Sequence, residues 1–138
     1  MSAALSEYKT FIDGLVELAR RQGASQVRLR DGMSFYPNPS REDQKYNDFV
    51  TSLNQEQREL LAELLRRERE VGIFDMLAFM YWKEYRLSRD GVELPVDPFD
   101  AESYYDLTCR LAGDTWPDER AVGEPSAVSD KQTTEQES

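Results

Sequence analysis

Three carboxylates close together in the last third of the chain are the first residues that could do chemistry. Asp97, Asp100 and Glu102 carry the oxygen ligands that a hard cation such as Ca²⁺ prefers. Their spacing lacks the Asp-x-Asp-x-Asp-Gly pattern of an EF-hand loop. Asp100 is also typical of a helix cap, and Glu102 of a first helical turn. We therefore predict the start of a helix here, with no metal and no cofactor.

A second carboxylate stands inside an apolar stretch. Asp75 is the only charged residue between Ile73 and Trp82, and burying an unpaired carboxylate is costly. One hypothesis is a perturbed acid in a pocket, which a small-molecule-binding or weakly catalytic domain would use. The interpretation we favour is structural: Asp75 lies on a solvated strip or pairs with an arginine.

The composition excludes most nucleophilic and metal chemistry. The chain has no histidine and one cysteine, so it can form neither a Ser-His-Asp or Cys-His arrangement nor a tetrahedral zinc site. Cys109 falls near the end of an expected helix, where the dipole opposes a thiolate, and is interpreted as a small core residue. No phosphate-cradling glycine loop or Gly-x-Ser-x-Gly motif occurs. We expect a protein that is not an enzyme.

The net charge of −10 indicates the kind of partner. Half of this excess lies in residues 113–138 and half in residues 1–112. Such acidity repels nucleic acids and anionic membranes but attracts a basic protein. No signal peptide or membrane-spanning stretch is recognisable, and we expect a soluble, cytoplasmic protein.

The apolar periodicity predicts a mainly α fold, with about five helices around a central apolar helix and one or two short β-hairpins. We expect a single helical domain over residues 1–117 and a disordered acidic tail over residues 118–138. The expected helices cover residues 7–21, 40–53, 55–72, 73–82 and 101–112, with a break at Gly72 between the third and the fourth. Asp-Gly hairpins are expected over residues 25–36 and 85–94.

Several aromatic residues could serve either the core or a partner. The stretch ending in Phe79, Met80, Tyr81 and Trp82 is apolar on every side, and burial in the core is the favoured interpretation. Alternatively, Tyr81 and Trp82 project as interface anchors. Trp116 either staples the start of the tail to the core or contacts a partner.

The first expected hairpin combines cations with aromatics. Arg28, Arg30, Phe35 and Tyr36 are the residue types that bind single-stranded nucleic acids. The overall acidity opposes that function, so an edge for protein interaction is at least as well supported.

Three strings resemble those of a small bacterial family of unknown function. They are Val27–Pro37 (VRLRDGMSFYP), Asp90–Val96 (DGVELPV) and the ending Cys109–Gly113 (CRLAG). The resemblance covers roughly residues 7–117, implies a bacterial source, and carries no activity or site residues.

The leading hypothesis is a non-catalytic interaction protein, in its concrete form an acidic inhibitor or immunity-type protein that binds a basic partner. A small-molecule pocket around Asp75 is the alternative. A nucleic-acid mimic, with carboxylates spaced like phosphates, is the third possibility.

Overall fold

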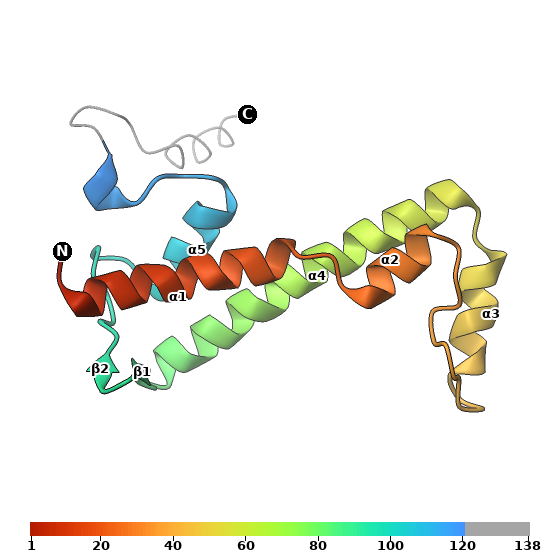
Figure 1. Ribbon diagram of the computed structural model, residues 1–138, viewed down its shortest axis with the longest axis horizontal. Coiled ribbons are helices and arrows are strands. Elements are labelled where there is room, and N and C mark those ends of the chain that lie inside the picture. Colours follow the sequence, from red (N-terminus) through yellow and green to blue (C-terminus); the bar gives the residue numbers. More distant parts are fainter. Residues whose placement is uncertain (121–138) are drawn as a thin grey trace, which may run out of the picture. The chain divides into compact units, whose positions relative to one another are not determined.

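The computed structural model describes residues 1–120 and confirms a mainly α fold with a minor β part (Figure 1). The elements are α1 (Ala3–Arg20), α2 (Ala24–Arg30), α3 (Gln44–Ser52), α4 (Gln55–Trp82), β1 (Ser88–Arg89), β2 (Val92–Glu93), α5 (Ser103–Leu111) and the 3₁₀ turn η1 (Pro117–Glu119). Most of the tail predicted from residue 118 lies outside the described residues, although Asp118 and Glu119 belong to η1.

The chain divides into two compact units. Unit 1 contains residues 1–16 and everything from Leu77 onward, and unit 2 contains Glu17–Met76. The boundary falls inside α1 and inside α4, so both helices contribute residues to each unit. Charge is distributed unequally: within the described residues unit 1 has twelve acidic and six basic side chains, whereas unit 2 has eleven and ten.

Helix α1 buries the stripe that its sequence predicts. Tyr8, Ile12 and Val16 are buried in unit 1 at spacings of four, as one face of an α-helix requires. The helix begins earlier than predicted, because Ser2 rather than Ser6 caps it: the Ser2 hydroxyl accepts from the Leu5 N–H at 3.2 Å.

The second Asp-Gly sequence forms the predicted hairpin. Asp90 and Gly91 both have positive φ, 52° and 80°, as the tight type I′ connection between β1 and β2 demands. The strands pair antiparallel, with Ser88 opposite Glu93 and Arg89 opposite Val92.

The first Asp-Gly sequence, in unit 2, does not form a hairpin, and that prediction was wrong. It ends helix α2 instead: Gly32 has φ 70°, and the Met33 N–H donates to the Arg28 carbonyl at 2.8 Å. This is the Schellman arrangement, in which a left-handed glycine follows the last helical turn. The same positive φ serves a hairpin turn or a helix stop, so the dipeptide alone does not distinguish them.

The sequence made two predictions about α4, one for its start and one for its middle, and only the first is confirmed. The predicted capping box is confirmed, since the Asn54 side chain accepts from the Gln57 N–H and the Gln57 side chain accepts from the Asn54 N–H, both at 2.9 Å. The predicted break at Gly72 is wrong, because α4 continues through it to Trp82. A lone glycine lowers helix stability by about 1 kcal/mol, which a long packed helix tolerates.

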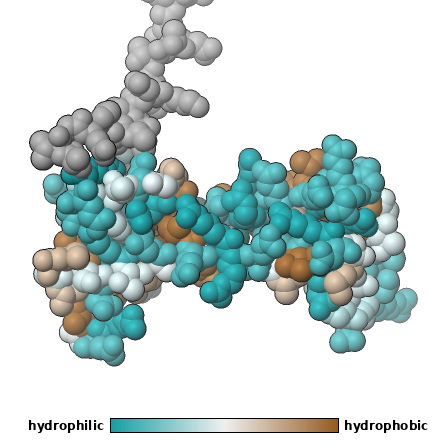
Figure 2. Space-filling model, turned by 45° about the horizontal axis from the view of Figure 1, so that its top comes forward, coloured by the Kyte–Doolittle hydropathy of each residue, from teal (hydrophilic) through white to brown (hydrophobic). Residues whose placement is uncertain are grey.

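The expectation of a fully buried central helix is also corrected. Leu77 is buried, but Phe79 and Trp82 are 52% and 67% exposed. The last turns of α4 therefore bury one side in unit 1 and expose aromatic side chains on another. Figure 2 shows apolar residues reaching the surface as patches among hydrophilic ones.

Candidate functional site

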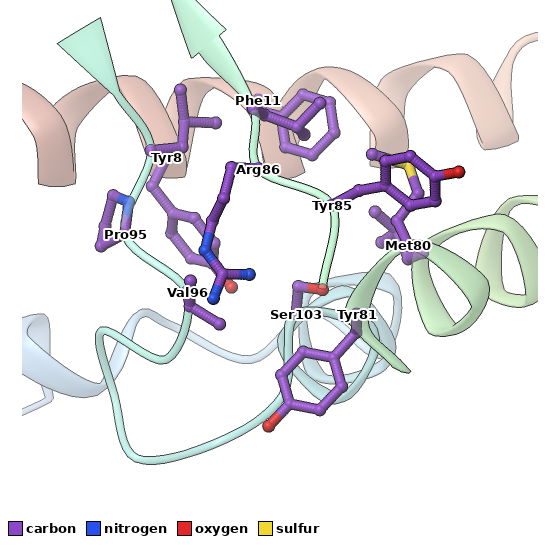
Figure 3. A pocket seen from close by; sticks show the side chains of 12 residues that line it. Tyr8, Phe11, Met80, Tyr81, Tyr85, Arg86, Pro95, Val96 and Ser103 are labelled. Carbon is purple, nitrogen blue, oxygen red and sulfur yellow. The ribbon is translucent and has the colours of Figure 1, made fainter. Parts of the chain in front are cut away.

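Unit 1 contains a pocket of about 50 Å³ formed by α1, the end of α4, the β-hairpin with its flanks, and α5 (Figure 3). Most of its walls are apolar. The lining residues are Tyr8, Phe11, Leu77, Met80, Tyr81, Tyr85, Arg86, Leu87, Leu94, Pro95, Val96 and Ser103. A volume of this size is small for a drug-sized ligand but admits the tip of one apolar side chain.

Arg86 is the charged residue among the lining side chains. It follows α4, and its guanidinium extends into the pocket in Figure 3. Within residues 1–120 no carboxylate forms an ion pair with it. The pocket therefore offers one cation among apolar walls.

A buried tyrosine–carboxyl pair lies behind this pocket. The Tyr8 hydroxyl donates to Asp106 Oδ2 at 2.6 Å, and the two residues are only 2% and 4% exposed. Burial raises the pKa of both groups. The hydrogen bond from Tyr8 partly opposes the rise in the pKa of Asp106, whereas the carboxylates of Asp97 and Glu102 add to it. The pair is a buried acid with a perturbed pKa, and of its two residues Tyr8 lines the pocket whereas Asp106 does not.

Beside the pocket, three aromatic rings meet two carboxylates. We call this group, Tyr81, Trp82, Tyr104, Asp97 and Glu102, the aromatic–carboxylate patch. The Tyr81 ring lies 5.3 Å from that of Trp82 and 5.7 Å from that of Tyr104, at angles of 90° and 89°. The Tyr81 hydroxyl donates to Asp97 Oδ2 at 3.2 Å. Tyr81 and Trp82 were predicted as anchors from sequence, and the fold brings the other three residues to them.

The patch has a negative field. Within residues 1–120 neither Asp97 nor Glu102 takes part in an ion pair. The pKa of the Tyr81 hydroxyl is raised by loss of solvent and by the charge of Asp97, and the pKa of Tyr104 is raised by loss of solvent and by Glu102. Loss of solvent is the larger cause of both pKa shifts, and the negative charge of the two carboxylates adds to it.

Unit 1 also contains a polar cluster that the sequence interpretation missed. The Lys9 side chain is only 9% exposed, and its Nζ lies 2.8 Å from Asp118 and 2.8 Å from Glu119. Burial alone lowers the pKa of Lys9, but the hydrogen bonds to these two carboxylates outweigh it and raise that pKa. The available signal was the position of Lys9, four residues after Leu5 and three before Ile12, on the buried stripe of α1.

Trp116 belongs to the same interior of unit 1. It is 3% exposed and packs 6.2 Å from the Tyr8 ring and 5.4 Å from the Phe99 ring. Its indole N–H donates to Asp13 Oδ2 at 3.2 Å, while Arg110 donates to Asp13 Oδ1 at 2.8 Å. Trp116 is thus buried in unit 1, where a residue that staples this segment to the core would lie.

The basic and aromatic residues expected on one hairpin lie on different elements of unit 2. Arg28 and Arg30 belong to α2, whereas Phe35 and Tyr36 follow it. Phe35 packs against the buried core of Leu29, Val50 and Ala62. The Tyr36 backbone is held by the Asn47 side chain, which accepts its N–H at 2.8 Å.

Three other residues were singled out from the sequence: Asp75, Cys109 and Asp100. Asp75 is exposed on α4 and does not line the pocket of unit 1. Cys109 is buried, as expected, and burial raises the pKa of its thiol. Asp100 does not cap α5, because the residue at the N-cap is Glu102.

Two features that residues 1–120 lack bear on function. These residues contain no group of three or more His, Cys, Asp or Glu side chains that could hold a metal ion. None of their helices combines the length and the apolar character needed to cross a membrane.

Comparison with known proteins gives a family and no activity. No curated protein and no solved structure matches the chain. A family model described as "Family of unknown function (DUF6547)" matches residues 1–118, a range that includes all of unit 2 and the part of unit 1 up to Asp118. The chain therefore belongs to the family of unknown function DUF6547.

Proposed function

We propose that this protein is a non-catalytic interaction domain that binds a basic partner through unit 1. The observation that carries the proposal is an exposed aromatic surface at the end of α4, next to carboxylates that form no ion pair with any residue in the described part of the chain. Phe79, Trp82 and Tyr85 are 52%, 67% and 60% exposed. Large aromatic side chains of this kind are over-represented among the residues that dominate binding energy at interfaces.

The charge of unit 1 supports a basic partner. Its described residues have a net charge of −6, against −1 for unit 2. Such a field accelerates association with a basic surface and is screened by salt, while aromatic contacts slow dissociation. If the covered surface of the partner is its active region, binding inhibits the partner, as an immunity-type protein does.

Photo-crosslinking tests the proposal. A photoreactive phenylalanine is placed at Trp82 and, as the control, at Phe49, which is 57% exposed on α3 of unit 2. Each full-length protein is irradiated in an extract of its native cells at low and high salt, and the adducts are identified by mass spectrometry. We expect one basic protein to crosslink from position 82 but not from position 49, with a lower yield at high salt.

Two results would contradict the proposal. One is the absence of any adduct from position 82. The other is the same set of adducts from positions 82 and 49, which would indicate random collision. Persistence of the adduct at high salt would contradict the electrostatic part alone.

A second candidate function is the binding of a small molecule in the pocket, which is favoured by the guanidinium of Arg86, since no carboxylate among residues 1–120 pairs with it. The occupant would be a small apolar carboxylate. It should shift the NMR resonances of Leu77, Leu87 and Leu94, and the Arg86→Gln variant should lose the shift. Lack of any shift with isovalerate or benzoate would contradict it.

A further inference from the structure

We infer that the aromatic–carboxylate patch binds an arginine side chain of the partner. The inference rests on the proposed function and names the group of the partner that the patch recognises. It follows from three properties of the patch: an open aromatic face, two carboxylates that have no ion-pair partner among residues 1–120, and their common position in the acidic unit.

The rings leave a face open for a planar group. Trp82 and Tyr81 meet at 90°, so the two rings do not stack on each other. An edge-to-face pair covers at most one face of either ring, and Trp82 is 67% exposed. The indole therefore presents a ring face to solvent, and indole is the aromatic group that attracts cations most strongly.

The carboxylates supply the acceptors that a stacked cation needs. Asp97 lies on the approach to α5 and Glu102 at its N-cap, and both act on the tyrosines that flank Trp82. No lysine or arginine among residues 1–120 neutralises either group by an ion pair. A cation from another molecule would meet an aromatic face and a carboxylate together.

Arginine fits this combination better than lysine does. A guanidinium is planar, so it stacks on an aromatic ring while its N–H groups donate within the same plane to carboxylates. It is also less strongly hydrated than an ammonium group, which lowers the cost of taking it out of water. Lysine provides the same charge without the planar geometry, so it should bind more weakly.

Three peptides test the inference by NMR. They are acetylated and amidated pentapeptides of glycine and serine around one central arginine, lysine or citrulline, the last being neutral but nearly the same shape as arginine. The indole N–H of Trp82 reports binding, and that of buried Trp116 is an internal reference in the same protein. We expect the arginine peptide to bind about tenfold more tightly than the citrulline peptide, with lysine between them.

Variants distinguish the contribution of the Trp82 ring to binding from that of the two carboxylates. Trp82→Phe keeps a weaker aromatic face and Trp82→Leu removes it, so affinity for the arginine peptide, followed through peptide resonances, should fall in that order. Asp97→Asn with Glu102→Gln should weaken binding by about tenfold. The control, Glu68→Gln with Asp75→Asn, removes the same charge from exposed positions in unit 2 and should change the affinity by less than about twofold.

The outcomes distinguish this inference from the proposed function. Equal binding of the arginine and citrulline peptides, or no response of the Trp82 indole to any of them, would overturn the inference. So would an equal effect of the two charge-removing pairs. A basic protein crosslinked from position 82 would still support the proposed function in each case, whereas absence of that adduct would refute the proposed function separately.

Discussion

The ion-pair cluster of Lys9, Asp118 and Glu119 allows a prediction about stability. Removing the two carboxylates should destabilise the protein more than removing the lysine does. The ammonium is buried at 9% exposure, whereas Asp118 and Glu119 are 38% and 54% exposed. Removing both carboxylates, by Asp118→Ala with Glu119→Ala, leaves a buried cation without an anion. Removing the cation, by Lys9→Met, releases two carboxylates that water can solvate.

The magnitudes follow from this asymmetry. An uncompensated buried charge costs about 3 kcal/mol or more. The cation–π contacts of Lys9 with Phe99 at 5.9 Å and Trp116 at 5.7 Å remain in that variant and offset part of the cost. The Lys9→Met change keeps the packing of the aliphatic stem and loses partly exposed ion pairs, about 1 kcal/mol in all. We therefore expect the double variant to be less stable than Lys9→Met by about 2 kcal/mol.

Urea denaturation followed by tryptophan fluorescence measures this difference. In a Trp82→Phe background Trp116 is the only tryptophan, so the signal reports unit 1. With a denaturant slope of about 2 kcal/mol per molar, the two midpoints should differ by about 1 M. If Lys9→Met is as destabilising as the double variant, or more so, the reasoning is wrong, because the buried ammonium without an anion is then not the main source of destabilisation.

Three further predictions concern stability, measured as the free energy of unfolding in urea. The pKa of Asp106 is raised in the folded state, so its carboxyl favours folding below its unfolded pKa and loses this effect as the pH rises through the folded value. Asp106→Asn should therefore gain stability over wild type on going from about pH 4 to about pH 8, and a constant difference would contradict this. Gly72→Ala should stabilise α4 by about 0.5–1 kcal/mol, because a Cβ there meets nothing within 4 Å, whereas Gly32→Ala should destabilise because φ is 70°. Asn54→Ala should cost about 1 kcal/mol through loss of the cap, and Asn54→Asp, which keeps the acceptor, should not.

The sequence predicted correctly those elements that depend on residues close together in the chain. The Asn54 capping box and the hairpin around Asp90 depend on residues within a few positions, and both are confirmed. The hairpin predicted at Asp31 was wrong because a left-handed glycine also ends a helix, and the choice depends on burial of Leu29 and Gln26 on one face of α2.

The candidate site was predictable only in part, for a related reason. Tyr81 and Trp82 were recognised from their type and their neighbours in the sequence. Their grouping with Tyr104 depends on the packing of α5 beside the end of α4, which no periodicity encodes. The position of Lys9 on the apolar stripe of α1 was a local signal, but its partners Asp118 and Glu119 lie more than a hundred residues away and could not be identified from it. The contact of Trp116 with Asp13 likewise joins distant parts of the chain, so its role was left undecided.

The passage of α1 and α4 through the unit boundary has a consequence for dissection of this protein. Any cut that separates Glu17–Met76 from the rest severs two helices in mid-course and removes hydrogen bonds from both. Neither unit can be excised at a loop as an autonomous module. Duplication, shuffling or truncation of the gene should therefore keep residues 1–120 as a block if α1 and α4 are to remain uncut.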